Sequence, residues 1–117
     1  MTFPPNKVVL VVDDEAKVRV HAAKILSEQG CYVLAAGTAI AAYRVLERDA
    51  PDVVLLDAHL PGLDVDDFHS RLKLAKIGAR LLLTSRRNQE GGLTGYRLIL
   101  KPFKAATLIA EIGTCKS

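Results

Sequence analysis

Short apolar runs alternate with segments of helical period along the chain, and this alternation most constrains the fold. The runs are mostly valine and leucine, which is typical of strands that are buried on both faces. Strands joined through helices need crossover connections, and these favour a parallel sheet with helices on both sides. The apolar runs are residues 7–12, 32–36, 53–56, 79–83 and a last run that ends at 98–100.

Four segments between or after these runs place apolar residues at helical spacing. Thr38 is a favourable N-cap for the second segment, and Gly30 and Gly78 follow the first and third, where helices commonly end. The predicted inner stripes are Val18, Ala22, Ile25 and Gln29; Ala39, Ala42, Tyr43 and Leu46; Val65, Phe68, Leu72 and Ala75; and Leu108, Ile109 and Ile112.

The alternation predicts one more helix, the fourth in chain order, over residues 86–95. Gly91, Gly92 and Gly95 fall within it, and each costs about 1 kcal/mol relative to alanine in a helix interior. We therefore expect this helix to be short or the segment to be disordered.

The length of 117 residues suits one hydrophobic core, so we expect a single domain over 1–117. The net charge of +3 is spread along the chain, without the basic stripe of nucleic-acid readers, and we expect no direct nucleic-acid binding. The run 8–12 is too short for a signal peptide or a membrane span, which predicts a cytoplasmic protein without membrane contact. Cys31 and Cys115 lie far apart and lack metal-ligand spacing, which predicts two reduced thiols.

Polar residues follow four of the predicted strands. The first strand leads to Asp13 and Asp14, the third to Asp57, the fourth to Thr84 and the fifth to Lys101. The carboxyl ends of parallel strands meet at one edge of the sheet, where open α/β folds bind their ligands. The sequence therefore predicts that three carboxylates, a hydroxyl and an ammonium converge there.

The charges of this set do not balance, because three ionised carboxylates sum to −3 and Lys101 offsets one unit. Two like charges about 4 Å apart repel by about 4 kcal/mol at an effective dielectric of about 20. Either one carboxyl stays protonated or a divalent cation binds. Hard oxygen ligands at a partly open site suit Mg²⁺, which also takes a phosphoryl oxygen. One carboxylate can then act as a nucleophile toward phosphorus, since phosphoryl transfer needs mainly positioning and charge neutralisation.

The stretches 11–15 (VVDDE), 57–64 (DAHLPGLD), Thr84 and 101–103 (KPF), in this order, resemble the receiver domain of bacterial two-component response regulators. The resemblance covers essentially the whole chain. It implies a flavodoxin-like α/β fold, (βα)5, with a doubly wound five-stranded parallel sheet in the order 2-1-3-4-5.

The resemblance also implies a metal site and its ligands. Asp14 would bind Mg²⁺ directly and Asp13 would reach it through water. Asp57 and the main-chain carbonyl of His59 would complete the protein ligands, while the His59 side chain is expected at the rim of the site.

For the phosphoryl group, the resemblance implies three residues. Asp57 would accept it from a sensor histidine kinase or a phosphotransfer protein. Thr84 would turn its hydroxyl toward it, and Lys101 would pair with it. The peptide bond between Lys101 and Pro102 would be cis, as is typical of the family.

The chain departs from the family pattern outside these residues. Leu98 stands three residues before the lysine, where the family has Tyr or Phe, and Tyr96 lies on the same strand face about 7 Å away. Val65 replaces the usual glycine eight residues after the acceptor, and the spacing from Thr84 to Lys101 is short. We expect complete phosphorylation chemistry and an altered output surface.

Three hypotheses follow. The first is a phospho-accepting receiver that is not an enzyme and signals through contacts with a downstream protein, as a monomer or weak homodimer. The second, motivated by Leu98, is a receiver-like adaptor that binds partners independently of phosphorylation. The third is an aspartate-nucleophile phosphohydrolase of the haloacid dehalogenase kind, although His59 stands where that class has a second aspartate.

Overall fold

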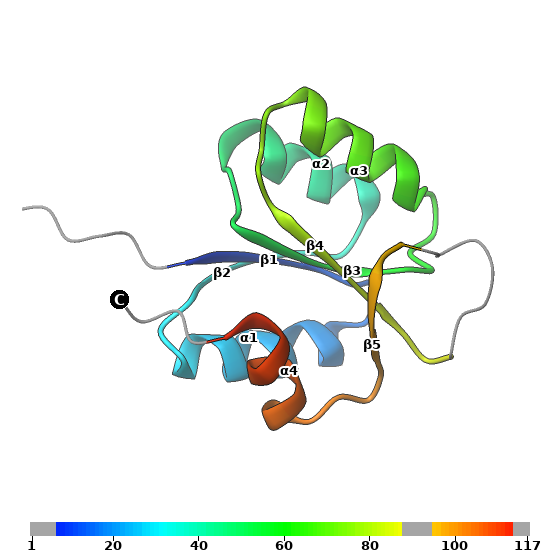
Figure 1. The fold of residues 1–117 in the computed structure, drawn as a ribbon. Coiled ribbons are helices and arrows are strands. Elements are labelled where there is room, and N and C mark those ends of the chain that lie inside the picture. The colour runs from blue at the N-terminus through cyan, green and yellow to red at the C-terminus, as the bar shows by residue number, and fades with distance from the viewer. Residues whose placement is uncertain (1–6, 88–94, 114–117) are drawn as a thin grey trace, which may run out of the picture.

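Five parallel strands form one sheet in the order β2-β1-β3-β4-β5, as predicted. The computed structural model describes residues 7–87 and 95–113 (Figure 1). In these residues the fold is flavodoxin-like α/β, with four helices. The elements are β1 (Val8–Val12), α1 (Ala16–Glu28), β2 (Tyr32–Ala36), α2 (Ala39–Arg48), β3 (Val53–Asp57), α3 (Val65–Leu74), β4 (Arg80–Ser85), β5 (Arg97–Leu100) and α4 (Ala105–Ile112).

Helices cover both faces of the sheet, with α1 and α4 on one side and α2 and α3 on the other (Figure 1). Successive strand residues point to opposite faces, so each strand contributes to two separate buried clusters. In β1, Val9 and Val11 pack with residues of α1 and α4, whereas Leu10 and Val12 pack with residues of α2 and α3. A strand buried on both faces needs apolar residues at every position, which explains the unbroken apolar runs.

The predicted helical stripes are largely confirmed. Most of their members are buried or packed against the two clusters, and Thr38 caps α2 by accepting a hydrogen bond from the N–H of Ala41 at 3.1 Å. Two stripe ends differ, because Gln29 and Ala75 are the C-cap residues of α1 and α3. None of the helices in the described residues has both the length and the apolar composition that crossing a bilayer requires.

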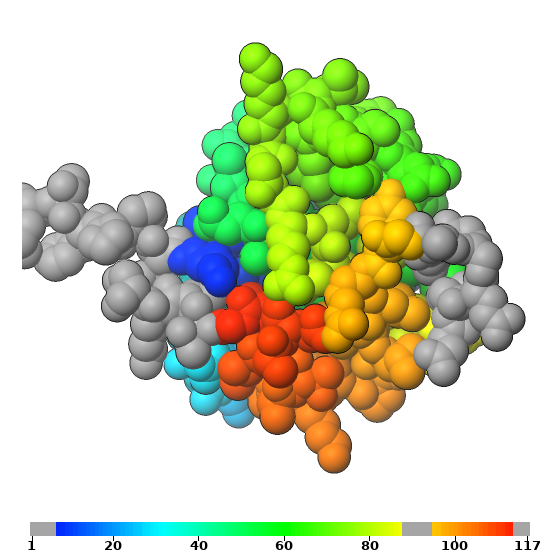
Figure 2. Space-filling view, in the orientation of Figure 1, coloured from blue at the N-terminus to red at the C-terminus, as the bar shows by residue number. Residues whose placement is uncertain are grey.

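The helix predicted over 86–95 falls mostly outside the described residues. Arg86, Arg87 and Gly95, which are described, lie in bends and a turn rather than in a helix. The helix that follows β5 is therefore α4, and it is tied to the strand by Arg97, which donates to the Glu111 carboxylate from Nε at 3.0 Å. Figure 2 shows β5 and α4 side by side on one face. These hydrogen bonds hold the pKa of Glu111 below its ordinary value.

β3 and β4 extend further than the apolar runs indicate. Asp57 pairs with Thr84 in the sheet register, and the N–H of Ala58 donates to the carbonyl of Thr84 at 2.9 Å. Polar side chains at these positions do not end the strands, because the backbone ladder is independent of side-chain polarity. Asp57 and Thr84 are consequently held by the sheet itself.

The prediction that both cysteines are reduced is wrong for Cys31, which is disulfide-bonded in the structure. Distance along the sequence was a poor guide, because the end of α4 returns to the start of the sheet. Lys7 Nζ donates to the carbonyl of Ile112 at 3.1 Å, and the N–H of Tyr32 donates to the carbonyl of Lys7 at 2.9 Å. Cys115 lies outside the described residues.

Candidate functional site

Four polar side chains lie at the carboxyl ends of four strands, each two positions after a core residue of the same strand. Because strand side chains alternate, a residue two positions after a core residue projects from the same face. All four project on the side of α1 and α4. The pairs of core and polar residue are Val11 with Asp13, Leu55 with Asp57, Leu82 with Thr84, and Ile99 with Lys101.

A lysine joins two of the carboxylates in the buried part of this edge. Lys101 Nζ lies 2.8 Å from Asp13 Oδ2 and 3.6 Å from Asp57 Oδ2. All three side chains are less than one tenth exposed, at 4%, 2% and 8%. Oxygen atoms of Asp13, Asp14 and Asp57 lie within 4.8 Å of one another, and Asp14 is exposed. The structure thus brings together the carboxylates and the ammonium that the sequence places at the strand ends.

Backbone N–H groups fix the second oxygen of both buried carboxylates. Asp13 Oδ1 accepts from the N–H of Glu15 at 2.9 Å, and Asp57 Oδ1 accepts from the N–H of His59 at 3.0 Å. The N–H of Lys101 itself donates to the carbonyl of Ser85 at 2.7 Å, which anchors the lysine to the end of β4. Each carboxylate therefore has one oxygen held by the backbone and one turned toward the ammonium.

Arg19 supports the turn between β1 and α1, a role that no pattern in the sequence indicates. Its Nη1 donates to the main-chain carbonyl of Asp13 at 2.8 Å. A side chain at Gly37 would meet this guanidinium, since a Cβ there would lie 2.9 Å from Nη1. The glycine after β2 thus leaves space for the arginine that fixes the Asp13 backbone.

The three carboxylates of the site carry more negative charge than Lys101 can offset. At an effective dielectric of about 20, Asp57 is attracted to Lys101 by about 5 kcal/mol and repelled by the two other carboxylates by about 7 kcal/mol. Water around the exposed Asp14 screens part of that repulsion, so about 1 kcal/mol of net strain remains. The donor set fits Mg²⁺, because it offers only hard oxygen atoms and its exposed member leaves positions open to water.

An ion pair spans the mouth of the site. Arg86 Nη2 lies 2.6 Å and 2.7 Å from the two oxygens of Glu15, so the loop after β1 is bridged to the end of β4. The bridge lowers the pKa of the Glu15 carboxyl below its ordinary value and raises the pKa of Arg86. Beneath it lies a cavity of about 360 Å³, lined by Glu15, Asp57, His59, Arg86, Arg87 and Lys101.

The remaining residues of the predicted site lie at its edges. His59 is exposed and lines the cavity, and its backbone N–H donates a hydrogen bond to Asp57 Oδ1. Thr84 is buried, at 2% exposure, opposite Asp57 in the sheet. The peptide bond between Lys101 and Pro102 is cis, as the resemblance implies.

The residues that depart from the family pattern lie on the opposite face of the sheet. Leu98 and Tyr96 both pack against the cluster of α2 and α3. The Tyr96 hydroxyl donates to Asp66 Oδ1 of α3 at 2.6 Å and lies 3.3 Å from His69 Nδ1. Burial and the Asp66 carboxylate raise the pKa of Tyr96 to about 12. Tyr96 therefore ties β5 to α3 and does not face the acidic site.

The family model of the response regulator receiver domain matches residues 9–113. The chain belongs to this family. Receiver domains of two-component response regulators are signalling modules with an acidic site, and in this chain Asp13, Asp14 and Asp57 form an acidic cluster at the strand ends.

Curated relatives of this receiver domain are longer proteins. The phosphate regulon transcriptional regulatory protein PhoB of Pseudomonas aeruginosa is 31% identical over 92% of this chain and 50% of its own length. The sensory transduction protein RegX3 of Mycolicibacterium smegmatis is 30% identical over 89% and 48%. The sporulation initiation phosphotransferase F of Bacillus subtilis is 27% identical over 67% and 63%. The chain spans about half the length of most of these relatives.

Solved receiver domains share the fold. The receiver domain of the hybrid histidine kinase CckA superposes with a TM-score of 0.76 at 27% identity, over 90% of this chain and 94% of that one. A CheY-like receiver domain of Methanospirillum hungatei gives 0.82 at 21% identity, over 92% and 90%, and shows the fold alone.

The charge imbalance at the site predicts that Asp57→Asn stabilises the domain. In a buffer without divalent cations, the free energy of unfolding should rise by about 1 kcal/mol, because one repelling charge is removed. The asparagine carbonyl can still accept the hydrogen bond from His59. Urea unfolding measures the change, with Asp49→Asn, an exposed carboxylate away from the site, as the control. A lower stability of Asp57→Asn would contradict this electrostatic description.

The raised pKa of Tyr96 predicts a stability that falls in strong base. The folded state favours the protonated phenol, so its contribution is complete below pH 10 and is lost as the pH rises toward about 12. Tyr96→Phe should be less stable than wild type by about 1 kcal/mol at neutral pH. The difference should close between pH 10 and pH 12. Urea unfolding across this range tests it, and a constant difference would show that the phenol does not titrate as described.

Proposed function

We propose that residues 1–117 form a single phospho-accepting receiver domain in which Asp57 takes a phosphoryl group from a histidine kinase or a phosphotransfer protein. The observation that carries the proposal is the buried ammonium of Lys101 between two carboxylates, 2.8 Å from Asp13 and 3.6 Å from Asp57. Such an arrangement offers an anionic nucleophile and, beside it, a fixed positive charge for an incoming phosphoryl group.

Asp57 acts as the nucleophile through Oδ2, because Oδ1 is held by the N–H of His59. Attack forms a bond from Oδ2 to phosphorus, while the bond from phosphorus to the donor atom breaks and the donor leaves with that electron pair. The product is an acyl phosphate on Asp57. Catalysis of this step rests on positioning and on charge neutralisation at the phosphoryl oxygens.

Lys101 and Thr84 serve the transferred group. The ammonium is already within 3.6 Å of the attacking carboxylate, so it can pair with a phosphoryl oxygen after a small shift away from Asp13. Thr84 stands opposite Asp57 in the sheet, where its hydroxyl can donate to the same group. Arg86 can also turn from Glu15 toward the phosphoryl group on Asp57, since Arg86 and Asp57 line the same cavity.

Asp13, Asp14 and Asp57 would hold Mg²⁺, with the main-chain carbonyl of His59 as a further ligand. Bound there, the ion would neutralise charge on the carboxylates and on the phosphoryl oxygens. The three aspartates supply the oxygen atoms at suitable mutual distances, and Asp14 keeps one side of the cluster open to solvent.

Four further expectations remain predictions. They are output through contact with a downstream protein, residence in the cytoplasm, the lack of direct nucleic-acid and membrane binding, and a monomeric or weakly dimeric state.

One observation favours the adaptor hypothesis as a second candidate. Leu98 has no ring or hydroxyl, and the nearby Tyr96 is bonded to Asp66 of α3 rather than free to move toward the site. A β5 surface whose side chains do not move on phosphorylation would suit partner binding that is independent of phosphorylation.

Incubation with Mg²⁺ and acetyl phosphate, followed by intact-protein mass spectrometry, tests the proposal. Wild type should gain the mass of one phosphoryl group, and Asp57→Asn should gain none. Asp52→Asn, which removes another carboxylate next to the sheet, should be modified like wild type. Omission of Mg²⁺ should abolish the product.

The outcomes separate the candidates. No product on wild type, or equal product on Asp57→Asn, would refute the phospho-accepting receiver and leave the adaptor. Release of phosphate from a phosphomonoester over many turnovers would instead support the phosphohydrolase and contradict the non-enzymatic assignment.

A further inference from the structure

The edge strand β2 leaves part of its backbone unpaired. Within the described residues β1 is the strand that pairs with β2. The N–H of Tyr32 donates to Lys7 at 2.9 Å, and the carbonyl of Ala36 accepts from the N–H of Asp13 at 3.1 Å, so these residues point their backbone toward β1. In a parallel pair, alternate residues point theirs the other way. The N–H and C=O groups of Val33 and Ala35 therefore face the open edge of the sheet.

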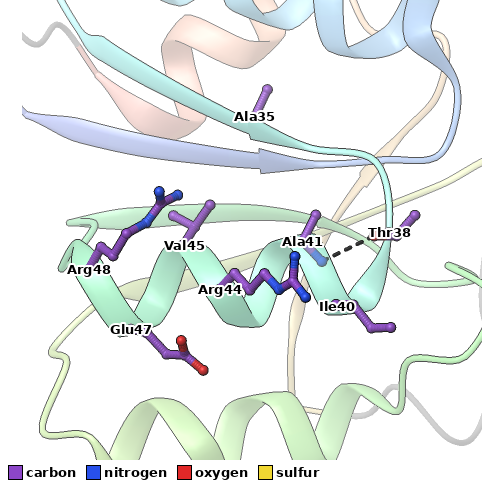
Figure 3. A pocket seen from close by; sticks show the side chains of 8 residues that line it. All are labelled: Ala35, Thr38, Ile40, Ala41, Arg44, Val45, Glu47 and Arg48. Carbon is purple, nitrogen blue, oxygen red and sulfur yellow. Dashed lines mark hydrogen bonds between the residues drawn. The ribbon is translucent and has the colours of Figure 1, made fainter.

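A groove runs along this edge between β2 and α2 (Figure 3). Its volume is about 540 Å³. The floor is apolar or small, and the walls carry charged side chains of α2. The lining residues are Ala35, Thr38, Ile40, Ala41, Arg44, Val45, Glu47 and Arg48. Ile40 is 67% exposed, so an apolar surface is available beside the polar one.

Two arginines of the groove have no partner in the described residues. The ion pairs and hydrogen bonds found in residues 7–87 and 95–113 do not include Arg44 or Arg48. Figure 3 shows Arg48 reaching from α2 toward the sheet and Arg44 lying along the helix near Ala41. The carboxylate of Glu47 points away from the sheet in the same view. The side of α2 near the open edge is therefore positively charged.

The spacing of these arginines matches an extended chain. Residues four apart in a helix are separated by about 6 Å along its axis. Residues two apart in a strand lie on the same face about 6.5 Å apart. A strand added beside β2 would place alternate side chains over α2, so two carboxylates separated by one residue could each reach one arginine.

We propose that the groove between β2 and α2 binds an extended acidic segment of a partner protein. The segment pairs its backbone with Val33 and Ala35 and extends the sheet beyond β2. Its alternate carboxylates pair with Arg44 and Arg48. Backbone pairing supplies affinity and the two arginines select acidic sequences, as in other cases of strand addition. The residues that line the groove do not include those that line the cavity at Asp57, so this proposal does not rest on the proposed phosphorylation.

The test uses the whole chain and a synthetic peptide that alternates glutamate with valine and threonine. The same peptide with glutamine in place of glutamate is the matched control. Amide chemical shifts from NMR locate the binding. We expect changes at Val33, Ala35 and the residues of α2, and weaker binding at high salt because the ion pairs are exposed.

Variants separate the contribution of the two arginines from that of backbone pairing with β2. The double charge reversal Arg44→Glu with Arg48→Glu should weaken binding of the acidic peptide at least about tenfold. Lys73→Glu, a single charge reversal on an exposed residue of α3, should leave it within about twofold. Ala35→Pro removes an outward N–H on an edge strand, where proline is tolerated, and should also weaken binding.

Three results would overturn the proposal. The first is equal binding of the glutamate and glutamine peptides, or no binding of either. The second is unchanged affinity in the double charge reversal, whose exposed positions do not disturb the core. The third is tighter binding of a single-stranded oligonucleotide than of the peptide at the same amides, which would assign the arginines to phosphates.

Discussion

The interaction on which the site depends is the buried contact of one ammonium with two carboxylates. Lys101 follows β5, Asp13 follows β1 and Asp57 ends β3, so the contact joins three strands that are not all neighbours in the sheet. Removing charged groups from water is costly unless they are paired and hydrogen-bonded. Here each carboxylate has an ammonium on one oxygen and a backbone N–H on the other. The pairing therefore holds only while the sheet keeps its register.

The parallel sheet makes this contact possible in a small domain. Core residues at Val11, Leu55 and Ile99 fix the direction of the residues that stand two positions later. The carboxyl ends of all strands meet at one edge, so the polar side chains need no long loops to come together. The same geometry places three aspartates beside one lysine, so two negative charges are left without a partner in the site. This surplus supports the proposal that the site binds a cation, which would in turn offset the charge of an incoming phosphoryl group.

Much of this could be predicted from the sequence, because it follows from local patterns. Unbroken apolar runs predict buried strands, and the residue after each run marks the edge of the sheet. The sequence could not predict contacts that depend on side-chain paths in three dimensions. The pairing of Arg86 with Glu15 joins residues 71 positions apart, and the support that Arg19 gives to Asp13 depends on space left by Gly37. Neither has a signature in composition or periodicity.

The cysteine prediction failed for a related reason. The prediction relied on the separation of the two cysteines along the sequence. In the structure, the end of α4 lies beside the start of the sheet, and this proximity decides which residues are near Cys31. The predicted ends of β3 and β4 also came too early, before Asp57 and Thr84. A polar side chain was interpreted as the end of each strand, whereas the backbone pairing of the two strands continues through these residues.

Calorimetric titration of the whole chain with Mg²⁺, in the absence of any phosphodonor, tests the central claim most directly. If the aspartates carry uncompensated negative charge, Mg²⁺ should bind saturably at one site, and Asp14→Asn should weaken that binding at least about tenfold. Asp14 is exposed, so the variant should keep its fold. Absence of saturable binding to wild type, or the same affinity in Asp14→Asn, would contradict the account.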